Sequence, residues 1–72
     1  MNPPLVSGRE AIAALKRLGF VEIGQKGSHV KLKCSQKGLI IIVPNHREVD
    51  RWTLRGILRS AEVSVQEFID AL

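Results

Sequence analysis

The feature that most constrains the fold is a run of strictly alternating residues from Ser28 to Cys34. Alternation of apolar and polar side chains is typical of a β-strand that buries one face. The predicted inward residues are Val30, Leu32 and Cys34, and the predicted outward residues are His29, Lys31 and Lys33. A second extended run, Leu39 to Val43, is uniformly aliphatic and stops at Pro44. Because the turn residues Gln36-Lys37-Gly38 separate the two runs, the sequence predicts an antiparallel hairpin.

The position of that turn also predicts the register of the hairpin. With the turn centred on Gln36 and Lys37, Cys34 lies opposite Leu39 and His29 lies opposite Pro44. His46 follows shortly after Pro44, so both histidines are expected at the same end of the hairpin.

Helical patterns precede and follow the strands. The segment Ser7 to Glu10 has the form of a capping box, and Gly19 is placed to end the first helix in a left-handed cap. The residues from Phe20 to Gln25 form a short candidate strand, followed by a predicted turn at Gln25-Lys26-Gly27. A second helix begins near Trp52-Thr53, and a second capping box at Ser64 to Glu67 opens a short last helix.

This order predicts an α+β fold: a helix, a three-stranded antiparallel sheet, and a C-terminal helix broken into two, with the helices on one face of the sheet. The apolar residues at helical and strand spacing define one expected core: Ile12, Leu15, Leu32, Leu54, Ile57, Leu58 and Phe68. A chain of 72 residues forms a single domain, in which residues 1–6 are expected to be a flexible extension.

The charge indicates the kind of partner, and the cysteine content indicates the cellular compartment. Eleven Lys and Arg against seven Asp and Glu give a net charge of +4, which favours an anionic partner such as nucleic acid or an acidic protein surface. The single cysteine, Cys34, fits a reducing compartment. The sequence shows no signal-peptide pattern and no apolar run near the ~20 residues that span a bilayer. We therefore expect a cytoplasmic protein with no membrane partner.

His29 stands at the head of a row of lysines on one strand face. Lys31 follows it at roughly 6.6 Å along the strand, and Lys33 continues the row. A proton-transfer group beside positive charges is typical of a phosphodiester site. The residues themselves leave three interpretations open: catalysis, anion binding, or a plain solvated face.

Other kinds of site are disfavoured by the same pattern. Cys34 and His29 are predicted on opposite strand faces, so they do not form a Cys–His nucleophile pair. Two histidines without a helical HExxH motif or a cysteine pair make a poor metal site. Arg51, Arg55 and Arg59 form one stripe along the second helix, which is either solvated or contacts phosphate or an acidic partner. Trp52 is expected to be half-buried as an anchor at the start of that helix, in preference to a platform for base stacking.

Four segments carry a family resemblance. They are LKRLGF at residues 15–20, GSHVKL at 27–32, VPNH at 43–46 and TLRGILRSAEVSVQEF at 53–68. Together, from about Ser7 to Leu72, they resemble the HicA toxin family. The resemblance implies a fold like the double-stranded RNA-binding domain and an mRNA-cleaving endoribonuclease of a type II toxin–antitoxin system. It also implies a HicB-like antitoxin that covers the site, and it places the family's essential histidine at His29.

One departure from the family pattern bears on partner docking. The family commonly has Gly before the Thr of the TLxxIL segment, where this chain has Trp52.

The chemistry that the resemblance implies needs no cofactor and no metal, because RNA carries its own 2′-hydroxyl nucleophile. His29 acts as general acid or base, and His46 is a possible second proton carrier. The residues expected to contact RNA or its phosphates are Ser28, Lys31, Lys33, Arg55 and Arg59. Two alternatives remain: a non-catalytic RNA-binding module, and a protein-interaction module in which Leu39 to Val43 and Trp52 form the docking surface.

Overall fold

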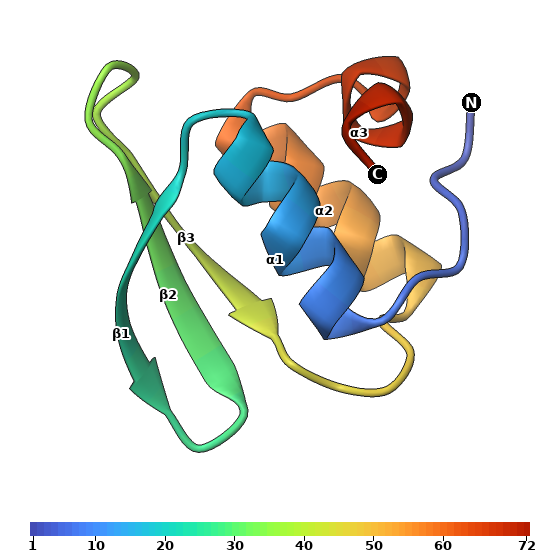
Figure 1. The fold of residues 1–72 in the computed structure, drawn as a ribbon. Helices are drawn as coiled ribbons and strands as arrows, with labels where there is room; N and C mark the ends of the chain where they lie inside the picture. The colour runs from blue at the N-terminus through green and yellow to red at the C-terminus, as the bar shows by residue number, and fades with distance from the viewer.

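The computed structural model describes residues 1–72 as a three-stranded antiparallel sheet with three helices on one of its faces (Figure 1). The elements in chain order are α1 (Gly8–Arg17), β1 (Val21–Lys26), β2 (His29–Cys34), β3 (Leu39–Pro44), α2 (Arg51–Ala61) and α3 (Val65–Ala71). The strand order is β1-β2-β3, so β2 is the central strand. The predicted α+β class and element order are confirmed, and the arrangement is consistent with a double-stranded RNA-binding-domain-like fold.

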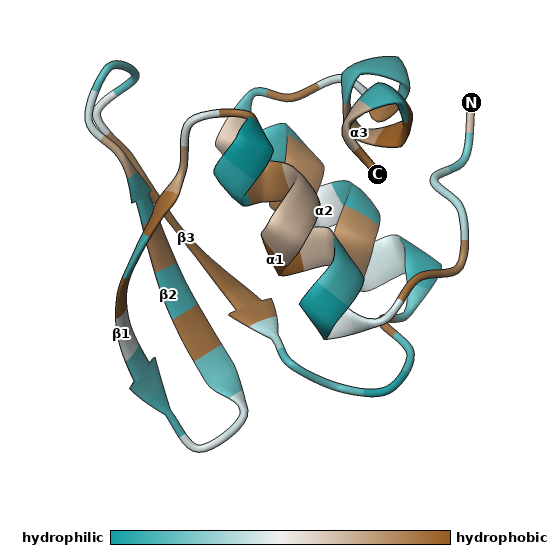
Figure 2. Cartoon of the chain, viewed as in Figure 1, coloured by the Kyte–Doolittle hydropathy of each residue, from teal (hydrophilic) through white to brown (hydrophobic).

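The β2–β3 hairpin has the predicted register. His29 pairs with Pro44 and Cys34 pairs with Leu39. Burial along β2 alternates strictly, with Val30, Leu32 and Cys34 buried and the residues between them exposed. Figure 2 shows this alternation as hydrophilic and hydrophobic bands along β2. The opposite face of the sheet carries no helix, so the outward residues of β2 face solvent.

The first hairpin differs from the prediction at its turn. The predicted turn at Gln25-Lys26-Gly27 is wrong: Gln25 and Lys26 belong to β1, and the turn consists of Gly27 and Ser28. Gly27 has a φ of +57°, and such a value at the first central position of a two-residue hairpin turn favours glycine. Lys26 is therefore paired with His29 across the ladder.

The helices α1 and α3 begin where their predicted capping residues lie, whereas α2 begins one residue before its predicted start near Trp52. Ser7 and Ser64 each form the predicted capping box, with Glu10 and Glu67 respectively. The α2 helix begins after Asp50, whose carboxylate accepts a hydrogen bond from the Thr53 backbone N–H at 3.1 Å. Gly19 has the predicted left-handed backbone, with a φ of +102°. All seven predicted core residues belong to one buried cluster, which α1, α2 and α3 form with the inner face of the sheet.

The N-terminal segment, predicted as a flexible extension, runs beside the helices. Val6 forms an isolated antiparallel bridge with Val49, and the Val49 N–H donates to the Val6 carbonyl at 2.8 Å. The structure gives Pro3 and Val6 buried positions. No helix in the structure has the length and hydrophobicity to cross a membrane, and α2, the longest, has 11 residues.

Candidate functional site

The open face of the sheet carries the row that the sequence singled out. His29, Lys31 and Lys33 are all exposed on β2, and they point away from the helices. Residues paired across a ladder point to the same face, so each member of the row has a neighbour on both sides. His29 lies between Lys26 and Pro44, Lys31 between Gly24 and Ile42, and Lys33 between Val21 and Ile40. The row is therefore basic along its length, and aliphatic side chains lie beside Lys31 and Lys33.

A surface depression lies beside His29 at the other end of the row. Its lining residues are Gly24, Gln25, Lys26, His29, Lys31 and Ile42. Gly24 is one of these lining residues and lies at a bulge in β1 between Glu22 and Gly24. A Cβ at Gly24 would meet no atom within 4 Å, and its φ lies outside the left-handed region. Neither packing nor backbone conformation requires this glycine, and its effect is to leave the space beside His29 open.

Lys26 is a site residue that the sequence reasoning missed. It stands directly opposite His29 and, with Lys31, places a second lysine next to the imidazole. The signal was present in the sequence: Gly-Ser between two extended runs is typical of a two-residue hairpin turn, and such a turn pairs the residues that flank it.

Ser28 and His46 meet beside the same end of the row. Their Oγ and Nε2 atoms are 3.2 Å apart, and which of them donates depends on the tautomer of His46. Two backbone hydrogen bonds fix this corner: the Asn45 N–H donates to the Ser28 carbonyl at 2.7 Å, and the Gly8 N–H donates to the His46 carbonyl at 2.8 Å. His29 and His46 thus lie at one end of the hairpin, as predicted, and His46 contacts Ser28.

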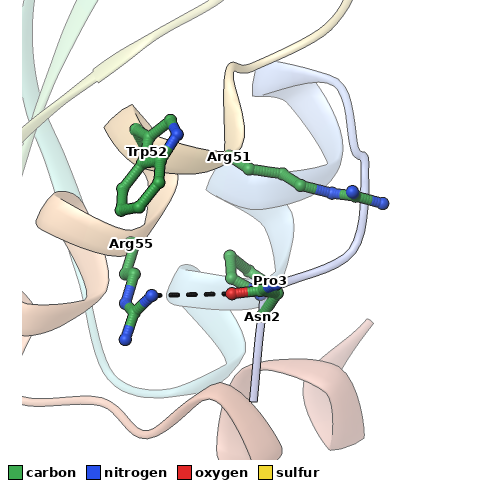
Figure 3. A pocket seen from close by; sticks show the side chains of 5 residues that line it. All are labelled: Asn2, Pro3, Arg51, Trp52 and Arg55. Atoms are coloured by element: carbon green, nitrogen blue, oxygen red, sulfur yellow. Dashed lines mark hydrogen bonds between the residues drawn. The ribbon is translucent and has the colours of Figure 1, made fainter.

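The arginine stripe does not belong to the same site. Arg51, Arg55 and Arg59 are exposed on α2, and α2 packs on the face of the sheet opposite to the His29 row. Arg55 Nη1 lies 3.5 Å from Asn2 Oδ1, and its guanidinium lies 5.9 Å from the centre of the Trp52 ring. Figure 3 shows this cluster at the start of α2, with Asn2 and Pro3 beside Arg55. The structure therefore brings Ser28 to His46 and places His29 and Lys31 in one depression, and it separates both pairs from Arg55 and Arg59.

The prediction that Trp52 is half-buried is wrong. The side chain is 77% exposed. The buried face of α2 consists of Leu54, Ile57, Leu58 and Ala61. At about 100° per residue, Trp52 lies about 200° around the helix from Leu54, and so it points away from the core.

Cys34 lies in the core, on the face of β2 opposite to His29, as predicted. It is a small buried hydrophobic residue and does not reach the histidine. No three His, Cys, Asp or Glu side chains gather where they could hold a metal ion.

These features define a small α+β domain whose open sheet face carries a histidine within a row of lysines. A family model described as the HicA toxin of bacterial toxin–antitoxin systems matches residues 8–63. This range includes the whole sheet, α1 and α2, so the chain belongs to the HicA toxin family. It is accordingly the toxin component of a toxin–antitoxin pair, and its partner is an antitoxin. No curated protein matches the chain.

Proposed function

We propose that this toxin is an endoribonuclease that cleaves mRNA and uses His29 as a general acid or base. The observation that carries the proposal is the position of His29: exposed on the central strand, with Lys26 opposite it and Lys31 next to it on the same face. A strand anchored on its other face by buried Val30 and Leu32 holds a catalytic group more rigidly than a loop does.

The reaction requires two proton transfers and no external nucleophile. The ribose 2′-hydroxyl loses its proton and attacks the adjacent phosphorus, a P–O bond forms, and the P–O bond to the 5′-oxygen breaks. The 5′-oxygen leaves with a proton, and the upstream fragment ends in a 2′,3′-cyclic phosphate. His29 performs one of these transfers. Lys31 and Lys26 stabilise the negative charge that develops on the phosphorane.

The other predicted residues have roles set by their distance from His29. Ser28 contacts phosphate, and His46 beside it is the candidate for the second proton transfer. Lys33 contacts the RNA backbone further along β2. Because Arg55 and Arg59 lie on the helix side, they contact a different part of the RNA from the scissile phosphate. A toxin that acts on mRNA works in the cytoplasm, and the chemistry requires no metal or cofactor.

The antitoxin is proposed to be HicB-like and to cover the open face of the sheet. Three aliphatic side chains, Val21, Ile40 and Ile42, are exposed there among the lysines. A partner with acidic and apolar groups complements such a surface, with a standard interface of ~1,200–2,000 Å² in total. Binding there also blocks His29 from RNA.

The decisive variant is His29→Ala, assayed on a single-stranded RNA with purified protein and a chelator present. We expect cleavage to slow by on the order of 10²–10⁴, the usual contribution of general acid–base catalysis. Stability should change by no more than about 0.5 kcal/mol, because the side chain is exposed. Gln36→Ala, at an exposed position in the β2–β3 turn at the other end of the hairpin, is the control and should retain the wild-type activity.

The same assay separates the alternatives. If the His29→Ala variant cleaves RNA as fast as the wild type, His29 takes no part in the mechanism. Wild-type protein that binds RNA with salt-sensitive affinity but never cleaves it is a binding module. Wild-type protein that neither binds nor cleaves RNA is a protein-interaction module.

A further inference from the structure

A second basic cluster lies on the helix side of the molecule, away from His29. It is lined by Asn2, Pro3, Arg51, Trp52 and Arg55. Both arginines are exposed, and Trp52 is the most exposed large hydrophobic side chain within the helices and strands, at 77%. Figure 3 shows Arg51 and Arg55 on the side of the N-terminal segment, with the Trp52 ring next to Arg55.

The fold itself does not account for Trp52. The residue does not belong to the core cluster, and its side chain is 77% exposed. Its contact is with the Arg55 guanidinium, 5.9 Å from the ring centre, which is within the range of a cation–π interaction. Most of the ring surface therefore remains free for a planar ligand.

The electrostatic surroundings of Trp52 favour an anion. Arg51 and Arg55 flank it, and Arg59 continues the stripe one turn further along α2. The first turn of α2 contains no acidic residue. The nearby Asp50 carboxylate is engaged by the Thr53 backbone N–H and hydroxyl, at 3.1 and 3.4 Å.

Arginine and tryptophan are suited to bind either RNA or protein. The surroundings of this cluster favour RNA. A protein interface buries a continuous apolar centre, whereas Pro3 is the single aliphatic residue that lines this cluster. The exposed aliphatic residues of the strands, Val21, Ile23, Ile40 and Ile42, lie in the sheet instead. Aromatic rings among positive charges are the composition of single-stranded nucleic-acid sites, where bases stack and the cations contact phosphates.

We propose that Trp52, Arg51 and Arg55 form a second binding site for single-stranded RNA, in which a base stacks on Trp52 and the two arginines contact the adjacent phosphates. The proposal rests on the proposed function in that RNA is the ligand, but it does not require cleavage. Its role is to hold a segment of the RNA other than the one at His29.

The chain offers a direct probe, because Trp52 is its only tryptophan and it contains no tyrosine. Full-length His29→Ala protein, which prevents cleavage during the measurement, is titrated with a ten-nucleotide oligoadenylate while tryptophan fluorescence is recorded. We expect saturable quenching and an apparent Kd that rises with salt concentration. A second titration, by anisotropy of fluorescein-labelled oligoadenylate, gives the Kd of variants without tryptophan.

In the anisotropy titration, Trp52→Ala should weaken binding by about 5- to 150-fold, the range expected for loss of one stacked base. Trp52→Phe should restore part of the affinity, because it keeps an aromatic ring. Arg55→Gln should raise the Kd. Arg9→Gln, which removes the same charge from α1, should leave the Kd nearly unchanged. Thermal melts of each variant show that it is folded.

Three results would overturn the proposal. The first is labelled RNA that binds while tryptophan fluorescence stays unchanged. The second is an unchanged Kd in folded Trp52→Ala. The third is a fluorescence response to the antitoxin with no response to RNA, which would assign the cluster to protein docking. Quenching by RNA in a protein whose wild type fails to cleave would reject the proposed function and leave this site intact.

Discussion

At the scale of single residues, Gly8 is the glycine with the least space for a side chain. A Cβ at this position would lie 2.6 Å from Asn45 Cα and 2.9 Å from His46 N, and it would also overlap the Pro44 carbonyl oxygen. The Gly8 N–H donates to the His46 carbonyl at 2.8 Å. The first residue of α1 thus packs directly against the backbone that carries His46, and only glycine permits that approach.

Gly8→Ala should therefore destabilise the protein by about 1–3 kcal/mol, the usual cost of overpacking a close contact. Urea unfolding measures this change. Gly56→Ala is the matched control, because a Cβ at Gly56 in α2 meets nothing within 4 Å. In that helix the substitution should stabilise by about 0.5–1 kcal/mol. Equal effects of the two variants would show that the close contact at Gly8 contributes nothing specific.

At the scale of elements, hydrogen bonds at helix ends connect segments that are distant in the chain. The Lys37 ammonium, in the β2–β3 turn, donates to the carbonyls of Ala61 and Glu62 at 3.0 and 2.8 Å, at the end of α2. Arg17, at the end of α1, donates to the Ala71 carbonyl at the end of α3 at 2.8 Å. A cation at a helix C-terminus is favourable because the last carbonyls lack partners within the helix.

The capping boxes make the stability of α1 and α3 depend on pH. Hydrogen bonds from the Ser7 backbone and side chain lower the pKa of Glu10 from its ordinary value of 4.5, and the equivalent bonds from Ser64 lower the pKa of Glu67. A carboxylate with a lowered folded-state pKa contributes stability above its unfolded-state pKa. That stability is lost as the pH falls through the folded-state value.

We expect unfolding midpoints in urea to fall as the pH drops below about 4.5, the ordinary value for these groups. The Glu10→Gln/Glu67→Gln variant should be less stable than the wild type above this pH, and the difference should shrink as the pH falls. Glu48→Gln, in the loop before α2, is the control because Glu48 caps no helix. A difference that stays constant from pH 7 to pH 3 would contradict this origin of the effect.

At the scale of the whole molecule, the two layers present two different surfaces. The open sheet face combines His29 and lysines with Ile40 and Ile42, which are 52% and 53% exposed. The helix side presents the arginine stripe and Trp52, and Pro3 is the single aliphatic residue in the lining of that cluster. If the antitoxin covers the sheet, the two surfaces respond differently to substitution.

Ile40→Ser/Ile42→Ser should weaken antitoxin binding by about tenfold or more, because each substitution removes apolar surface that the interface would bury. Arg55→Glu/Arg59→Glu should have a smaller effect on the antitoxin and should weaken RNA binding instead. Isothermal titration of both variants with the purified antitoxin measures the difference. The reverse ranking would place the antitoxin on the helix side.

Features that depend on near neighbours along the chain can be predicted from the sequence. The register of the β2–β3 hairpin follows from a turn of fixed length, and the outward direction of His29 follows from the two-residue period of a strand. Both capping boxes span only four residues. The exposure of Trp52 belongs to this group too, because its angle from Leu54 around the helix is fixed by helical geometry, although it was predicted wrongly.

Contacts between residues that are distant in the chain depend on the tertiary structure. Ser28 contacts His46 across 18 positions, and Gly8 packs against the chain at Asn45. The same packing puts Arg55 on the other layer from His29, although both were candidates for one RNA site. These relations depend on where each helix lies across the sheet. That placement results from how the whole core packs, and no local period or motif encodes it.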